Sequence, residues 1–147
     1  MKKRSSILII LFVFISIALR AQTPDADAIK ELINKAYVEG LHNGGNLDET
    51  RKGFHPGFDL LILKNNQLEK LPIYNWIEST EKRSKDNTVA QLPKTTVNFV
   101  NIDITGTSAV AKIELSRDGK LIFTDYLSLY KFEEGWKIVG KIYYKHP

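Results

Sequence analysis

The alternation of apolar and polar residues from Lys94 onward constrains this chain more than any other feature of its sequence. Three turn signals interrupt it. Asp118-Gly119 is a strong two-residue hairpin signal, Gly106-Thr107 is a weaker one, and Glu133-Glu134-Gly135 suits a turn with glycine in the left-handed region. Because successive side chains of a strand point to opposite faces, the pattern predicts a four-stranded antiparallel meander with one apolar face.

Pairing the strands outward from these turns predicts which residues share the buried face. That face is predicted to hold Val100, Ile102, Ile104, Ala109, Ala111, Ile113, Leu115, Ile122, Thr124, Tyr126, Ser128, Tyr130, Phe132, Trp136, Ile138, Ile142 and Tyr144. The opposite face is predicted to hold Asn101, Asp103, Lys112, Glu114, Asp125, Lys131, Lys137 and Lys141, with Lys112 opposite Asp125. A slip of one residue would turn every side chain over, so each statement about the interior depends on this register.

Helices are predicted before the meander. Thr23-Pro24 offers an N-cap followed by proline at the first helical position, and apolar residues then recur at helical spacing until Gly44-Gly45. Asn46, with Glu49 three residues later, predicts a short second helix that Gly53 ends.

A hairpin and a third helix complete the N-terminal half. Residues 58–64 and 67–71 read as two strands joined by Asn65-Asn66, because asparagine tolerates positive φ. Pro72 then starts a helix with Trp76 on its apolar side, and residues 86–92 read as a loop. Helices, a hairpin and a meander with one apolar face indicate an α+β domain.

The N-terminus resembles an export signal. A basic head, Met1 to Arg4, precedes a 13-residue apolar run from Ile7 to Leu19, which is too short to cross a bilayer, and Ala21 is a plausible cleavage position. We therefore expect residues 1–21 to be a signal peptide, residues 22–147 to form one domain, and the protein to be periplasmic or secreted. The alternative is an uncleaved anchor, since Arg20 is not ideal next to a cleavage site.

Removing the signal changes the charge of the chain. The full sequence has 21 Lys and Arg against 17 Asp and Glu, and four of the basic residues lie in the signal. The mature chain would be neutral, so we expect it to bind neither nucleic acid nor a membrane surface.

Four groups of residues carry a resemblance to a known family. They are Phe54-His55-Pro56, then Ile102 to Gly106 with Ala109 to Lys112, then Phe123 to Leu129, and Gly135 to Val139 with Lys141. In order and spacing they resemble the nuclear transport factor 2-like (NTF2-like) superfamily, also called SnoaL-like, and are most similar to its putative lumazine-binding subfamily. The likeness covers nearly all of residues 25–145. It implies a cone-shaped α+β fold in which N-terminal helices pack into a strongly curved, mostly antiparallel sheet.

The motifs of several enzyme classes are missing. The chain has no glycine-rich phosphate loop, no nucleophile elbow and no cysteine, and its three histidines lack the spacing of metal ligands. We therefore expect neither a cofactor nor a metal.

The resemblance also bears on catalysis. Enzymes with this fold, such as ketosteroid isomerases and polyketide cyclases, resemble one another in placing a carboxylate or histidine inside the cone as a general base. The predicted register turns Asp103, Glu114 and Asp125 away from the cone and leaves only Asp59 and His55 beside its first strand. We expect a non-catalytic module that binds a small molecule or a partner. The alternative is a small isomerase or dehydratase-type enzyme with His55 or Asp59 as base.

The predicted interior is rich in aromatic and hydroxyl groups, which suit a small aromatic or heterocyclic ligand. The candidate pocket residues are Tyr37, His55, Trp76, Thr124, Tyr126, Ser128 and Tyr130. The competing interpretation is that these side chains fill the core and bond to the backbone, and that His55 is a turn residue.

The predicted outer face of the sheet is more apolar than a water-covered face should be. It holds Val97, Phe99, Val110, Leu121, Phe123, Leu127, Leu129, Val139 and Tyr143. We therefore expect a homodimer formed through this face.

Overall fold

The computed structural model describes residues 24–85 and 92–147. Its elements, in chain order, are α1 (Pro24–Leu32), the π-helical segment η1 (Ile33–His42), α2 (Leu47–Gly53), β1 (Phe54–Lys64), β2 (Gln67–Pro72), α3 (Ile73–Lys85), β3 (Thr96–Thr105), β4 (Ser108–Arg117), β5 (Lys120–Phe132) and β6 (Gly135–Lys145). The predicted signal peptide, the cap at Thr23 and nearly all of the predicted loop lie outside the described residues. The predicted order of helices, hairpin and meander is confirmed.

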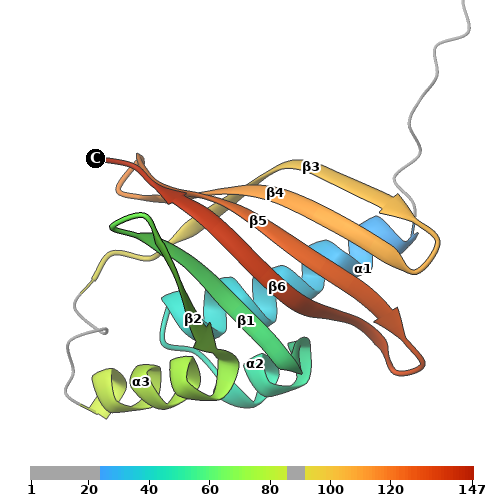
Figure 1. The fold of residues 1–147 in the computed structure, drawn as a ribbon, viewed down its shortest axis with the longest axis horizontal. Coiled ribbons are helices and arrows are strands. Elements are labelled where there is room, and N and C mark those ends of the chain that lie inside the picture. The colour runs from blue at the N-terminus through green and yellow to red at the C-terminus, as the bar shows by residue number, and fades with distance from the viewer. Residues whose placement is uncertain (1–23, 86–91) are drawn as a thin grey trace, which may run out of the picture.

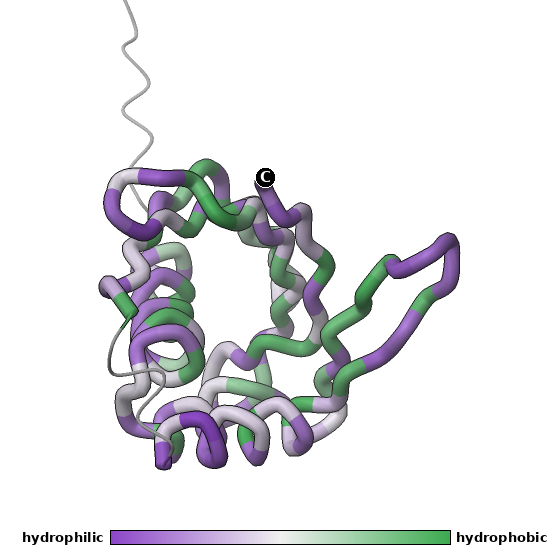
Figure 2. Tube along the Cα trace, turned by 90° about the vertical axis from the view of Figure 1, so that its left-hand side faces the viewer, coloured by the Kyte–Doolittle hydropathy of each residue, from purple (hydrophilic) through white to green (hydrophobic). Residues whose placement is uncertain are grey.

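One six-stranded sheet organises the fold, in the order β2-β1-β6-β5-β4-β3. All neighbours are antiparallel except β1 and β6, which run parallel. The long helix made of α1 and η1 crosses behind the meander, and α3 lies beside the β1–β2 hairpin (Figure 1). In a view from the side, helices and sheet face each other around the interior (Figure 2). The predicted α+β architecture, with helices packed into a curved sheet, is confirmed.

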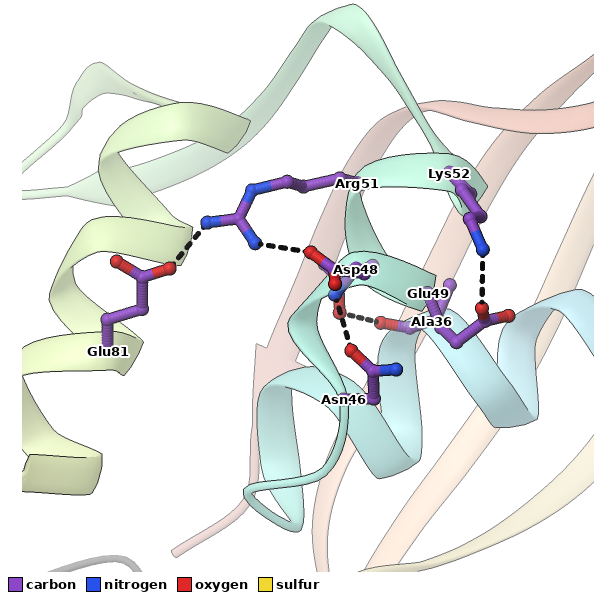
Figure 3. Close-up of polar contacts among 8 residues, drawn as sticks. Ala36, Asn46, Asp48, Glu49, Arg51, Lys52 and Glu81 are labelled. Atoms are coloured by element: carbon purple, nitrogen blue, oxygen red, sulfur yellow. Dashed lines mark hydrogen bonds and ion pairs between the residues drawn. The ribbon is translucent and has the colours of Figure 1, made fainter.

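Helix α2 is held at both of its ends. The Asn46 side chain accepts a hydrogen bond of 2.8 Å from the Asp48 backbone N–H, which caps the helix as predicted (Figure 3). Arg51 bonds both Asp48 and Glu81, so it ties α2 to α3 (Figure 3). Thr50, which is fully buried, donates to the Ala36 carbonyl at 2.8 Å and fixes α2 against η1.

The predicted turns are all present. Asn65 and Asn66 have positive φ, and so do Asp118 and Gly119 in the turn between β4 and β5. Gly106 and Gly135 also adopt positive φ, at 57° and 116°. The turn chemistry was therefore a sound guide to where each strand begins.

The predicted faces are wrong for β5, because an extra residue follows its turn. Ser116 pairs with Leu121 as expected, but the next residue, Leu115, pairs with Phe123. Ile122 is left unpaired as a β-bulge, which shifts the strand by one residue and turns the rest of it over. Phe123, Asp125, Leu127 and Leu129 consequently face the helices.

Two further bulges act in the same way. In β6, Leu129 pairs with Ile138 and Ser128 with Gly140, so Val139 is the extra residue. In β3, Phe99 pairs with Ile113 and Asn101 with Lys112, so Val100 is the extra residue. In β6 the residues after Val139 present the face opposite to the predicted one. In β3 the residues before Val100 do so, and Val97 and Phe99 therefore pack against the core, whereas Ile102 and Ile104 pack against it as predicted.

Because of these bulges, most of the residues predicted to line the pocket face outward, and other residues face the interior instead. Tyr126, Tyr130, Ile142 and Tyr144 are exposed, while Asp125 and Lys141 are buried. The Cα partner of Lys112 is Tyr126, so the predicted opposition of Lys112 and Asp125 is wrong. The prediction holds for β4, where Ala109, Ala111, Ile113 and Leu115 are buried, and for Trp136 and Ile138.

Helices in the described part of the chain are all too short or too polar to span a membrane.

Candidate functional site

Two charged side chains are buried in the core opposite the helices. Asp125 is fully buried, and Lys141 is 6% exposed. Their strands are neighbours: Asp125 pairs with Tyr143, and Lys141 with Leu127, so the two lie diagonally on one face. The Val139 bulge sets this arrangement, because without it Lys141 would point to the other face.

Tyr37 completes this polar cluster from η1. Its hydroxyl donates to Asp125 Oδ2 at 2.5 Å, and Lys141 Nζ lies 3.0 Å from the same oxygen. Lys141 also donates to the Tyr37 hydroxyl oxygen. Asp125 Oδ1 is buried and makes no hydrogen bond with the described residues. The cluster therefore retains an unused acceptor.

Aromatic rings surround the Lys141 ammonium. Nζ lies 4.7 Å from the ring centroid of Tyr37, 5.1 Å from that of Tyr143 and 5.4 Å from that of Trp76. Such contacts favour the charged amine. Burial nevertheless lowers the pKa of Lys141, and the neighbouring Asp125 carboxylate opposes that shift. Burial, followed by the charge of Asp125, raises the pKa of Tyr37 well above its usual range, so its hydroxyl stays protonated and donates.

A cavity of about 550 Å³ opens beside Lys141. Its apolar wall comes from the helices, from the hairpin and from the meander, and consists of Leu41, Leu60, Leu71, Trp76, Leu92, Phe123 and Tyr143. Its polar wall is cationic or neutral, with His42, Arg83, Arg117 and Lys141. A concave, mostly apolar space with a few polar groups is typical of small-molecule sites.

His42 lies at the end of η1 and faces this cavity. Its ring meets that of Tyr37 edge to face at 4.8 Å, and its Nε2 is buried without a hydrogen-bond partner among the described residues. Burial, and then the positive charges of Lys141, Arg117 and Arg83, lower the pKa of His42 to about 3. The imidazole is therefore neutral at pH 7.

The sequence-predicted pocket residues divide into three groups. Trp76 lines the cavity, and Tyr37 lies beneath it in the polar cluster. The predicted inward orientation is wrong for Thr124, Tyr126, Ser128 and Tyr130, because the Ile122 bulge turns them to the outer face. Any ligand in the cone is out of their reach.

His55 and Asp59, the candidate bases of the alternative enzyme hypothesis, do not line this cavity. His55 Nδ1 accepts a 3.0 Å hydrogen bond from the Gly57 backbone N–H, and its ring stacks on Phe132. Asp59 lies 3.4 Å from Lys70 on the neighbouring strand. Both contacts are structural, as the turn interpretation of His55 expected.

Sequence reasoning missed the polar groups that line the cavity, namely His42, Arg83, Arg117 and Lys141, and it turned Asp125, the buried partner of Lys141, to the opposite face. A usable signal was present in β5, where leucine occupies positions 127 and 129 and tyrosine and serine the alternating ones. Leucine is buried far more often than serine or tyrosine. In the described ranges, 24–85 and 92–147, no group of three His, Asp or Glu side chains could hold a metal ion.

Comparison with known proteins assigns the fold to a family. The sequence profile described as putative lumazine-binding matches residues 24–144. The chain belongs to this family. An NTF2-like protein of Shewanella baltica is 31% identical, with a TM-score of 0.66 over 82% of this chain and 93% of that one. An NTF2-like protein of Methylobacillus flagellatus is 25% identical, with a TM-score of 0.62 over 84% and 93% of the two chains.

One curated relative of the chain has a named activity. Aldolase FrzH of Cladobotryum sp is 24% identical over 112 residues, which are 76% of this chain and 84% of the aldolase. The NTF2-like superfamily predicted from the four groups of residues is confirmed by these matches.

Proposed function

We propose that this chain is a non-catalytic module that binds a small, flat, heterocyclic molecule in the cone. The observation that carries the proposal is the cavity of about 550 Å³, whose wall combines Trp76, Phe123 and Tyr143 with a few fixed polar groups. Aromatic walls favour a planar ligand through stacking. The description of the family suggests lumazine as the first compound to test.

The two tryptophans allow a test that also locates the ligand. Trp76 lines the cavity, whereas Trp136 lies elsewhere and donates to Asp25 at 3.0 Å. Trp136→Phe leaves Trp76 as the reporter, and Trp76→Phe leaves Trp136 as the matched control. Lumazine should quench the first variant much more strongly than the second. Absence of quenching in both variants at millimolar lumazine would count against a lumazine-like ligand.

The second candidate function is an enzyme that acts on a carbonyl compound. The observation that favours it is the buried cluster of Asp125, Lys141 and Tyr37, together with the similarity to an aldolase. Lys141 is the member of this cluster that lines the cavity. Its ammonium could donate to a carbonyl oxygen and stabilise the charge that develops there when a water molecule accepts a proton from the α-carbon.

Exchange of α-protons in D2O tests the second candidate. Small ketones and aldehydes would be followed by NMR with the unmodified protein and with Lys141→Met. Exchange that requires Lys141 would support the enzyme. Equal rates with both proteins would leave only the binding module.

We also propose export and pairing of two copies. The basic head and short apolar run support export, and N-terminal sequencing that returned Met1 from an envelope fraction would refute it. For pairing, the exposed face of the meander carries several large apolar side chains among polar ones. It keeps Val110 of the predicted set and otherwise carries Val100, Tyr126, Tyr130, Ile142 and Tyr144, because Leu127 and Leu129 are buried. Exposed apolar side chains gathered on one face suit a two-fold contact.

A further inference from the structure

We propose that the cavity takes its ligand as an anion, with a carboxylate of that ligand seated against Arg117 and His42. This inference rests on the binding function proposed above and specifies the class of ligand. It starts from the polar part of the cavity wall, which contains cationic and neutral side chains and, among the described residues, no carboxylate.

The guanidinium of Arg117 has unused hydrogen-bond donors at this wall. Its Nε donates to Thr95 Oγ1 at 2.9 Å, and within the described ranges its two terminal nitrogens make no hydrogen bond or ion pair. A guanidinium presents its donors in a planar fork that matches a carboxylate. Using Nε for Thr95 fixes the plane of that fork and leaves its outer edge for a ligand.

A short network holds Arg117 and His42 in a fixed relation. Asn43, which follows His42, accepts from the Thr95 backbone N–H at 2.8 Å and donates to the Thr95 carbonyl at 3.1 Å. Thr95 in turn accepts from Arg117. The end of η1, the start of β3 and the end of β4 are thus joined by side chains, and both candidate contacts are placed before a ligand arrives.

The unpartnered Nε2 of His42 is the second, independent observation. A buried polar atom without a partner carries a free-energy penalty unless something else satisfies it. The positive charges of Lys141, Arg117 and Arg83, with burial, keep the ring neutral, so one of its nitrogens carries a hydrogen. In the tautomer with hydrogen on Nε2, His42 donates to an anion in the cavity.

Lys141 does not supply the unbalanced charge, because Asp125 lies 3.0 Å from it and offsets it. The positive charge at the wall on which the proposal rests is that of Arg117, which forms no ion pair with the described residues. Arg117 is therefore the residue whose removal should distinguish an anionic ligand from a neutral one.

The experiment compares 2-naphthoate with 2-naphthamide by calorimetric titration. The two probes share a flat aromatic body and differ only in charge and in the group that would meet Arg117. We expect naphthoate to bind at least about tenfold more tightly, the range expected for a charge-assisted hydrogen bond. Arg117→Gln should abolish this preference and leave the affinity for naphthamide within about twofold.

Lys120→Gln is the matched control, because Lys120 is the Cα partner of Arg117 in the same hairpin, is exposed and does not line the cavity. It removes the same charge and should keep the preference for naphthoate. If Arg117→Gln does not fold, the unmodified protein still tests the proposal through its relative affinity for the two probes and through the pKa of His42. The pKa of His42 should rise from about 3 when naphthoate is bound, because the carboxylate favours the charged imidazole. Naphthamide, which is neutral, should leave this pKa unchanged.

The outcomes separate the two proposals. Equal affinity for the two probes, a preference that survives Arg117→Gln, or binding of lumazine without any binding of naphthoate would overturn the anion site and leave the binding function standing. Failure of naphthoate, naphthamide and lumazine alike would overturn the binding function and the anion site with it.

Discussion

His42 makes the stability of this protein sensitive to acid, and the size of the effect follows from its surroundings. The pKa of histidine is 6.5 in the unfolded chain and about 3 at this site. Between these two values the unfolded chain binds a proton that the native protein does not bind. Stability is therefore full above pH 6.5 and is lost as the pH falls towards 3.

The magnitude can be worked out from the two pKa values. Each unit of difference is worth about 1.4 kcal/mol, so the full loss is about 5 kcal/mol. At pH 4 most of the window has been crossed, and the free energy of unfolding should be lower by about 3 kcal/mol than at pH 7 from this residue alone. That is a large fraction of the stability of a small domain.

Urea unfolding followed by circular dichroism, at pH 7 and at pH 4, measures this loss. Other groups titrate in the same range, so the comparison is made with His42→Phe, which keeps an aromatic ring and cannot be protonated. The unmodified protein should lose about 3 kcal/mol more between the two pH values than the variant does. Equal losses in the two proteins would refute a neutral, desolvated His42 and the positive surroundings inferred for the cavity.

Three further predictions concern the packing of the core and the pairing of two copies. Asp125→Ala leaves the Lys141 charge buried and unpaired and should lower the free energy of unfolding by about 3–5 kcal/mol, whereas Asp125→Leu combined with Lys141→Met should restore most of it in the same urea assay. Gly53→Ala places a Cβ 2.3 Å from that of Ala36 and should lower thermal stability by about 1–3 kcal/mol, measured by calorimetry. Ile142→Lys, at an exposed position of the outer face, should convert a dimer into a monomer in light scattering, and a monomeric mass for the unmodified protein would contradict the pairing.

The sequence was sufficient for the elements of the fold because local chemistry decides them. Asn46 caps α2, Asn65-Asn66 and Asp118-Gly119 take the positive φ that tight turns require, and Pro72 precedes α3. These signals act over a few residues, so they need no knowledge of the rest of the chain.

The faces of the strands could not be predicted in the same way, because bulges break the period. Ile122, Val139 and Val100 are β-branched residues that look like ordinary strand positions. Whether such a residue is paired or bulged depends on the curvature of the whole sheet, and no short segment of the sequence determines that curvature. Since one bulge inverts every later side chain, a correct turn still led to an incorrect pocket.

Asp125 shows why the error was hard to detect. A carboxylate in the middle of a strand normally marks the solvent face, and here it is fully buried beside Lys141 and Tyr37. Its partners come from residues 88 positions earlier and 16 positions later in the chain. Only the folded arrangement brings these three groups together, so the candidate site is a product of tertiary structure.

The central claim is that a small molecule binds inside the cone rather than on the outer face of the sheet. Titration of the ¹⁵N-labelled protein with lumazine and with 2-naphthoate, followed by NMR, tests it most directly. The claim predicts that the indole N–H of Trp76 and the ring of His42 shift together and saturate, while the backbone amides of Tyr126 and Tyr130 on the outer face stay in place. Saturable shifts on the outer face with none at Trp76 or His42 would contradict it.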